Sequence, residues 1–234
     1  MSGAFVLHAP RVVTCDAARA TAGDPLGVVE GGAVLVENGR ISAVGKDHEV
    51  AARARGVEVR ALEGVLTPGL VDAHTHAPWA GSRHHEYAMR MAGAGYEEIA
   101  KAGGGIVSTM RAVRAASREE LLVELCLRVE RMTALGVTTI ECKSGYGLDE
   151  ANEAKQLEVV AAASARVRAR LVPTYLALHA LPPEAAGDRD AYAARVADAW
   201  LPAIAAKQLA RFVDAYVDRA AFTVEQARRV LATG

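Results

Sequence analysis

The stretch that decides the fold is LTPGLVDAHTH at residues 66–76, where a Thr-Pro-Gly tripeptide leads into an apolar run that ends on two histidines. Proline and glycine interrupt regular structure, so the tripeptide predicts a boundary between two parts of the chain. The apolar run predicts a strand over residues 70–76. Because side chains two residues apart face the same side of a strand, His74 and His76 are expected to point one way at its carboxyl end.

The chemistry of these two histidines is that of a metal site. Their imidazoles would lie about 6–7 Å apart at Cβ, a separation at which both can converge on one ion. Asp72 lies one step deeper on the same face, where it could orient a ligand. The bare His-x-His pattern is weak, because the chain has seven histidines. From this motif alone, metal ligands and packed or exposed histidines both remain open.

Upstream of the boundary the sequence alternates between short apolar runs and turn formers. Asn38-Gly39 joins two such runs at the spacing of a two-residue hairpin. The candidate strands cover residues 5–7, 12–14, 33–37, 41–44 and 57–61. We therefore predict that residues 1–66 form a small all-β module of the β-sandwich type.

Downstream of the boundary, over residues 67–234, strands alternate with helices. The predicted strands are 70–76, 137–143, 172–180 and 212–217, and the predicted helices are 96–101, 117–135, 149–165, 189–208 and one that opens at Thr223. Ser117 followed by Glu120 forms a capping box at the start of the second helix. Such alternation predicts a parallel sheet. A (β/α)8 barrel takes about 250 residues, so the segment is either a small open α/β sheet or half a barrel.

Composition excludes several classes of function. The 27 basic and 28 acidic residues give a net charge of −1, which favours neither nucleic acid nor an anionic membrane as a partner. The three cysteines are odd in number and include no CxxC pair, as expected in a reducing compartment. With neither a signal peptide nor a run of 18 apolar residues, we predict a cytoplasmic protein.

Six segments together resemble one enzyme family. They are PGLVDAHTH at 68–76, AGSR at 80–83, MAGAGYEEIA at 91–100, GGGI at 103–106, KSGYGL at 143–148 and HALPP at 179–183. Their order and spacing are similar to those of imidazolonepropionases, which belong to the amidohydrolase superfamily. The resemblance implies a metal-dependent (β/α)8 TIM-type barrel, of which this chain holds the first four or so β/α units.

The resemblance also implies a reaction and roles for residues. The family hydrolyses the ring C–N bond of 4-imidazolone-5-propanoate to N-formimidoyl-L-glutamate in histidine degradation, using water activated by one zinc or iron ion. His74 and His76 match metal ligands. Arg83 matches the residue that holds the propionate, since a guanidinium binds a carboxylate bidentately. Tyr146 matches a substrate-binding tyrosine. His179 matches a substrate-binding and catalytic histidine that would hydrogen-bond the ring carbonyl or its oxyanion.

Some expectations concern less central residues. Tyr96 joins Asp72 as a second-tier candidate, and His84 and His85 are expected in a loop. The family's remaining metal ligands lie on later strands and have no counterpart here, so the 234-residue chain alone is predicted to be poorly active or inactive. A homodimer is possible by the same resemblance.

Two alternatives remain. One is another amidohydrolase, such as a deaminase of the guanine type. The combination of Arg83, Tyr146 and His179 favours a carboxylate-bearing imidazolone over guanine. The other is a non-catalytic fragment or pseudoenzyme that acts by association, which the missing ligands favour for the chain as it stands.

Overall fold

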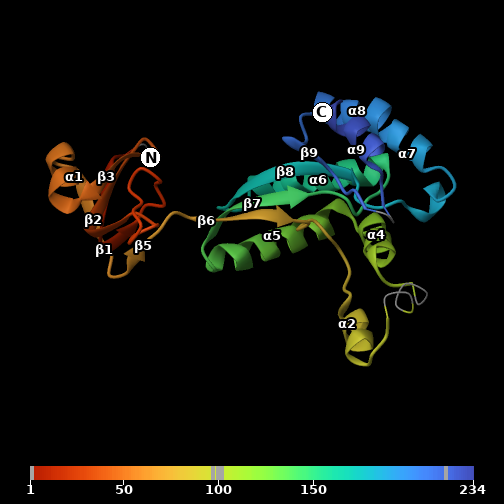
Figure 1. Cartoon of the computed structure of the whole chain (residues 1–234), viewed down its shortest axis with the longest axis horizontal. Helices are drawn as coiled ribbons and strands as arrows, with labels where there is room; N and C mark the ends of the chain where they lie inside the picture. The colour runs from red at the N-terminus through yellow and green to blue at the C-terminus, as the bar shows by residue number, and fades with distance from the viewer. Residues whose placement is uncertain (1–2, 96–97, 99–102, 219–220) are drawn as a thin grey trace. The chain divides into compact units, whose positions relative to one another are not determined.

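The computed structural model describes residues 3–95, 98, 103–218 and 221–234 (Figure 1). The chain divides into two compact units, Met1–Gly69 and Leu70–Gly234. The sequence predicted this division between residues 66 and 67, just before the Thr67-Pro68-Gly69 tripeptide. Each unit is described by itself below.

The first unit is built on one mixed sheet. Its strands are β1 (Phe5–Val13), β2 (Val28–Glu37), β3 (Arg40–Lys46), β4 (Glu58–Ala61) and β5 (Val65–Leu66). The order is β3-β2-β1-β4, and β5 also pairs with β1. Asn38 and Gly39 join β2 to β3 with φ values of 51° and 74°, as a tight two-residue hairpin requires. The predicted hairpin is therefore confirmed.

Three features of this unit differ from the expectation. The runs predicted at 5–7 and 12–14 are the two ends of β1, because His8 and Ala9 continue the pairing with β2. The five strands form a single sheet instead of two facing sheets. The module predicted to be all-β also contains α1 (Asp47–Arg53). This helix buries only Val50, so it has no apolar periodicity, and Glu49 stabilises its start by accepting from the Lys46 amide.

The second unit carries a parallel sheet of four strands. These are β6 (Leu70–Thr75), β7 (Val137–Lys143), β8 (Arg170–Leu178) and β9 (Phe212–Ala215), in the order β6-β7-β8-β9. Every neighbouring pair is parallel and follows chain order. The predicted alternation of strands and helices is confirmed, and each strand lies at or within two residues of its expected start.

The helices of this unit follow the prediction in part. The expected ones are α5 (Arg118–Ala134), α6 (Glu150–Ser164), the continuous run α7 (Arg189–Arg195), η2 (Val196–Trp200) and α8 (Leu201–Ala206), and α9 (Val224–Leu231). Ser117 caps α5 and forms the predicted capping box. A short 3-10 turn, η1 (Pro183–Ala185), precedes α7. The helix predicted at 96–101 lies outside the described residues apart from position 98.

Within the described part of this second unit, two α-helices were not predicted, α2 (His84–Met91) and α4 (Ile106–Ala115). The prediction that His84 and His85 belong to a loop is therefore wrong, because they form the first turn of α2. The start of this helix is stabilised by a contact with a segment that is distant in the sequence. Buried Glu86 accepts hydrogen bonds from Arg83 and from the Gly105 amide, and no apolar stripe in the sequence announces the helix.

The two faces of the parallel sheet have opposite chemistry. Ile140 and Cys142 of β7 are buried in an apolar cluster with Leu125 of α5 and Val160 of α6. Figure 1 shows α5 running alongside the sheet. Among the alternate residues of β7, Glu141 and Lys143 carry charge and pair with each other. Strand alternation thus directs one face to the helices and leaves the other polar, as in the wall of a barrel.

None of the described helices is both long enough and apolar enough to cross a membrane.

The apolar face of α5 provides a test of this packing. Leu125 is fully buried, whereas Leu127 on the same helix is 44% exposed. We expect Leu125→Ala to lower the free energy of unfolding by about 2–5 kcal/mol, because it leaves a cavity, and Leu127→Ala to change it by less than about 0.5 kcal/mol. Urea unfolding followed by tryptophan fluorescence measures this, since both tryptophans lie in the second unit. Equal effects of the two substitutions would contradict the packing of α5.

Candidate active site

The two histidines of the deciding stretch lie where β6 ends. Their ring centroids are 6.1 Å apart, with the planes at 76°. The Nδ1 atom of His76 lies 2.8 Å from the carbonyl oxygen of Ser144. A carbonyl oxygen only accepts, so Nδ1 must carry the proton, and Nε2 then presents a lone pair. That is the form in which an imidazole binds a metal.

The environment of His76 keeps its ring neutral. Burial, reinforced by the nearby His179, lowers the pKa of His76 to about 4. Removing a charged imidazolium from water is unfavourable, and a second imidazole adds repulsion. His76 is therefore uncharged at neutral pH and suited to donate its Nε2 lone pair.

Tyr146 lies in the turn at 144–148 that follows β7. Its ring centroid is 5.1 Å from that of His76 and 5.2 Å from that of His179. Burial raises the pKa of the Tyr146 phenol, so the hydroxyl keeps its proton. The side chain can therefore donate a hydrogen bond into the site.

His179 follows β8 and stacks on His76. The ring centroids are 4.3 Å apart and the planes differ by 13°. Its Nδ1 atom lies 2.8 Å from the carbonyl oxygen of Gly145, so this nitrogen also carries the proton. Burial lowers the pKa of His179. The neutral imidazole thus offers an acceptor at Nε2. The role expected from the sequence, donation to the carbonyl or oxyanion of the substrate, would require His179 in its imidazolium form.

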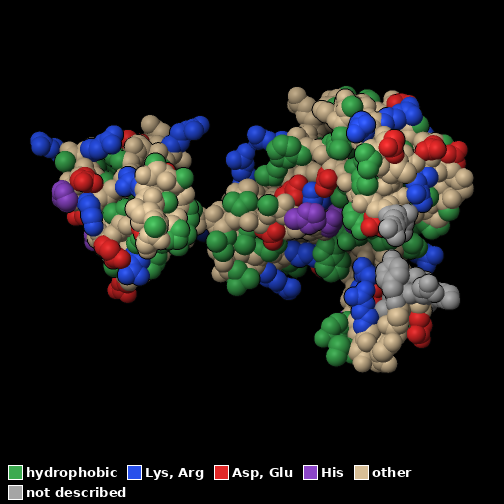
Figure 2. All heavy atoms as spheres, in the orientation of Figure 1, with side chains coloured by type: hydrophobic (Ala, Val, Ile, Leu, Met, Phe, Trp, Pro, Cys, Tyr) green, Lys and Arg blue, Asp and Glu red, His purple; other side chains and the backbone are tan. Residues whose placement is uncertain are grey.

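The structure therefore gathers three predicted residues, His76, Tyr146 and His179, from three consecutive strand ends. Figure 2 shows histidine side chains clustered on one face of the second unit, with acidic and basic side chains beside them. The charged neighbours include Lys143, which pairs with Asp214 of β9 at 2.7 Å. In parallel α/β folds, ligands bind at the carboxyl ends of the strands, where this cluster lies.

Arg83 reaches the same region from the segment before α2. Together with Tyr146, Trp79 and Thr109, it lines a cavity of about 240 Å³. Its Nε and Nη2 atoms donate to one oxygen of Glu86, at 2.8 and 2.6 Å. The other oxygen of Glu86 accepts from the Gly105 amide at 2.9 Å. The guanidinium is thus oriented by a buried carboxylate that is itself anchored to backbone.

The second-tier candidates contribute less. The Asp72 carboxylate lies 3.4 Å from the main-chain nitrogen of His74, so its recorded contact is with the backbone and not with the imidazole. Tyr96 lies outside the described residues.

A metal ion would find two donors of the right kind here. His74 and His76 supply imidazole nitrogens, and the tautomer of His76 suits coordination. Among the described residues, no group of three His, Cys, Asp or Glu side chains is placed to hold a metal ion. A catalytic zinc site uses about three protein ligands, so these residues fit part of such a site.

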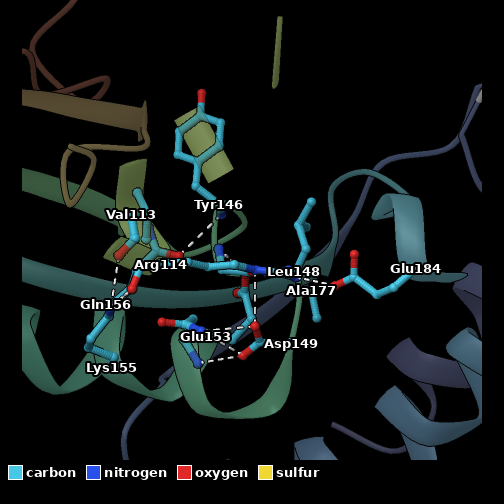
Figure 3. Close-up of polar contacts among 12 residues, drawn as sticks. Val113, Arg114, Tyr146, Leu148, Asp149, Glu153, Lys155, Gln156, Ala177 and Glu184 are labelled. Carbon is cyan, nitrogen blue, oxygen red and sulfur yellow. Dashed lines mark hydrogen bonds and ion pairs between the residues drawn. The ribbon is translucent and has the colours of Figure 1, made fainter. Parts of the chain in front are cut away.

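The sequence did not point to the residues that support this cluster. Glu153 and Gln156 on α6 bind the amides of the turn that carries Tyr146 (Figure 3). A glutamate and a glutamine three positions apart in a predicted helix are typical of a solvated face. No local pattern could have identified them, because both are fully buried only in the folded structure.

The turn at 144–148 packs tightly enough on α6 to exclude a side chain. A Cβ atom on Gly147 would lie 2.4 Å from the backbone of Asn152 and Glu153, whereas one on Gly187 would meet nothing within 4 Å. We expect Gly147→Ala to lower the free energy of unfolding by about 1–3 kcal/mol, and Gly187→Ala to change it by less than about 0.5 kcal/mol. Thermal or urea unfolding of the two variants measures the difference. A harmless Gly147→Ala would mean that the turn does not contact α6 as described.

The two metal donors found among the described residues give a second prediction. With two imidazoles, the purified 234-residue chain is expected to hold zinc weakly and to lose nearly all of it on dialysis against a chelator. Elemental analysis after dialysis measures the retained metal. One equivalent retained per chain, and lost in His74→Ala, would show that the chain completes a site by itself.

Comparison with curated proteins supports the resemblance. No protein-family model matches the chain. The imidazolonepropionase of Sphingopyxis alaskensis is 49% identical over 213 residues, which are 90% of this chain and 52% of that protein. That of Anaeromyxobacter dehalogenans is 44% identical over 232 residues, 97% of this chain and 54% of that protein. That of a Bradyrhizobium strain is 47% identical over 208 residues, 88% of this chain and 52% of that protein.

Solved structures support the fold. Guanine deaminase of E. coli superposes with a TM-score of 0.58 at 15% identity, over 87% of this chain and 43% of that protein. N-isopropylammelide isopropylaminohydrolase of Burkholderia multivorans superposes with a TM-score of 0.51 at 19% identity, over 90% of this chain and 44% of that protein. These likenesses concern the fold, and the predicted partial barrel preceded by a β module is confirmed.

The chain spans about half the length of the curated relatives it matches. Within that span the likeness covers nearly all of its residues. The chain is therefore a homologue of the imidazolonepropionases, corresponding to about half of such a protein.

Proposed function

We propose that this chain supplies the substrate-binding part of an active site that hydrolyses 4-imidazolone-5-propanoate to N-formimidoyl-L-glutamate in histidine degradation. One observation carries the proposal. His76, Tyr146 and His179 converge from the ends of three neighbouring strands. The centroids of their rings lie within 5.2 Å of one another. The relatedness to imidazolonepropionases supports the choice of substrate.

Arg83 fits the propionate of this substrate. Its side chain is 40% exposed and lines a cavity that Tyr146 also lines. A guanidinium fork matches a carboxylate in shape and charge. The anchored carboxylate of Glu86 limits the rotation of the fork, so that less side-chain entropy is lost on binding.

Tyr146 and His179 would orient the imidazolone ring. The protonated phenol of Tyr146 donates a hydrogen bond, which a ring carbonyl can accept. The neutral His179 accepts at Nε2, which a ring N–H can satisfy. These two contacts complement each other, since the ring carries both a carbonyl and N–H groups. Together they would fix which face of the ring meets the attacking water.

His74 and His76 would hold one zinc or iron ion, which needs about one further protein ligand besides these two. Such an ion lowers the pKa of a bound water and polarises a carbonyl. The half-buried, neutral ring of His76 and the proton on its Nδ1 support this role. The small molecule would then lie between the metal ligands and Arg83.

The cellular setting is part of the proposal. Cys15, Cys126 and Cys142 are all free thiols, which supports a cytoplasmic protein. The near-zero net charge argues against nucleic acid as a partner. A homodimer remains a prediction from the family resemblance.

Replacing Arg83 tests the proposal in the protein isolated at its cellular length. Arg83→Lys keeps the charge and removes the fork, so kcat/KM for 4-imidazolone-5-propanoate is expected to fall by about 10- to 100-fold. Arg90→Lys is the matched control, because Arg90 is an exposed residue in the last turn of α2 and is expected to leave the rate unchanged.

A substrate analogue separates carboxylate recognition from general damage. An imidazolone with a propyl chain in place of propionate should be turned over equally by the parent protein and by Arg83→Lys. If the variant lowers both rates equally, or lowers neither, Arg83 does not bind the propionate.

A further inference from the structure

The turn at 144–148 is attached to α6 through a buried carboxylate. One oxygen of Glu153 accepts from the Gly145 amide at 2.9 Å, and the other accepts from the amides of Gly147 and Leu148, both at 2.8 Å. The Ser144 hydroxyl adds a further hydrogen bond. A carboxylate that accepts only can satisfy four donors at once.

Gln156, three residues further along α6, supplies the remaining contact. Its side-chain oxygen accepts from the Tyr146 amide at 3.1 Å, and its nitrogen donates to the carbonyl of Pro78 at 2.7 Å. Four consecutive amides, from Gly145 to Leu148, therefore bind side chains of α6. Figure 3 shows Glu153 and Gln156 of α6 beside Tyr146 and Leu148 of the turn.

The carbonyls of the same turn face the histidines. Ser144 accepts from His76 Nδ1 and Gly145 accepts from His179 Nδ1, each at 2.8 Å. The contact is close, because a Cβ atom on Gly145 would lie 3.0 Å from both Cβ and Nδ1 of His179. Its φ of 105° is also one that glycine adopts readily. The two peptides that join Ser144 to Gly145 and Gly145 to Tyr146 thus each have their N–H bound to α6 and their carbonyl bound to a histidine of the site. The Gly147 carbonyl instead accepts from Arg114 Nε at 2.7 Å.

We propose that Glu153 is a positioning residue, which fixes the tautomers of His76 and His179 by holding the turn whose carbonyls receive their Nδ1 protons. Without a fixed acceptor, a neutral imidazole can carry its proton on either nitrogen. With both carbonyls in place, both Nε2 atoms present lone pairs. The proposal rests on the proposed function in one respect only, which is that these lone pairs bind a metal ion at His76 and a substrate N–H at His179.

The carboxylate chemistry explains why glutamate is required. In Glu153→Gln, one acceptor oxygen becomes an NH2 group that faces backbone N–H donors, so at least one amide of the turn loses its partner. In Glu153→Asp, the charge remains but the reach is shorter by one methylene. Both changes should release the turn, and Glu153→Gln should do so more strongly.

The test is nitrogen NMR of the histidine rings in the 234-residue chain labelled with 15N-histidine. In the parent chain, His76 and His179 are expected to show one protonated nitrogen at Nδ1 and one bare nitrogen at Nε2. In Glu153→Gln, the two ring-nitrogen signals of each histidine should move towards each other, as in a tautomer mixture. Glu150→Gln, on the exposed first turn of the same helix, is the control and should match the parent.

Glu153→Asp is the second variant and should give a smaller change in the same direction. If the parent rings carry their protons on Nε2, or if a folded Glu153 variant keeps the parent pattern, the proposal is overturned. The readout needs no turnover. The expected NMR pattern in a protein that does not hydrolyse imidazolonepropanoate would reject the proposed function and leave the positioning role standing.

Discussion

The arrangement of the site depends on one hydrogen-bonded contact, that between the carboxylate of Glu153 and the turn after β7. A buried carboxylate is unfavourable unless it is fully hydrogen-bonded. Burial indeed raises the pKa of Glu153, and the donors of the turn oppose that rise. The hydrogen bonds therefore stabilise both groups, because the carboxylate needs donors and the buried amides need an acceptor. The carbonyls on the opposite side of the turn then have defined positions from which to orient His76 and His179.

The sheet supplies the frame for this contact. Along β7, apolar side chains face α5 and α6, while Glu141 and Lys143 face the other way. The same alternation brings Asp214 of β9 into contact with Lys143 across the polar face. The two carboxylates compensate the charge of Lys143, whose side chain is 5% exposed and would be unfavourable there without partners. The residues of the site thus lie at or just after the ends of strands. The turn that follows β7 connects them to helix α6.

Much of this architecture could be predicted from the sequence, because it is encoded locally. Asn38-Gly39 gave the hairpin, Ser117 with Glu120 gave the start of α5, and the apolar run after Gly136 gave β7. The supporting residues could not be predicted, since their roles arise only from contacts between distant segments. Helix α2 depends on the contact of Glu86 with Gly105, and Glu153 looks like a surface charge until α6 packs on the turn. The tautomer of His179 likewise requires the position of Gly145, which no spacing in the sequence reveals.

The most direct test of the central claim is a comparison of two substrates on the protein isolated from its own cells at its natural length. Turnover of 4-imidazolone-5-propanoate and of guanine would be measured side by side with zinc and with iron supplied. The account predicts hydrolysis of the imidazolone to N-formimidoyl-L-glutamate and no deamination of guanine, because Arg83 and Tyr146 line one cavity suited to a carboxylate-bearing ring. Turnover of guanine, or of neither compound, would contradict it.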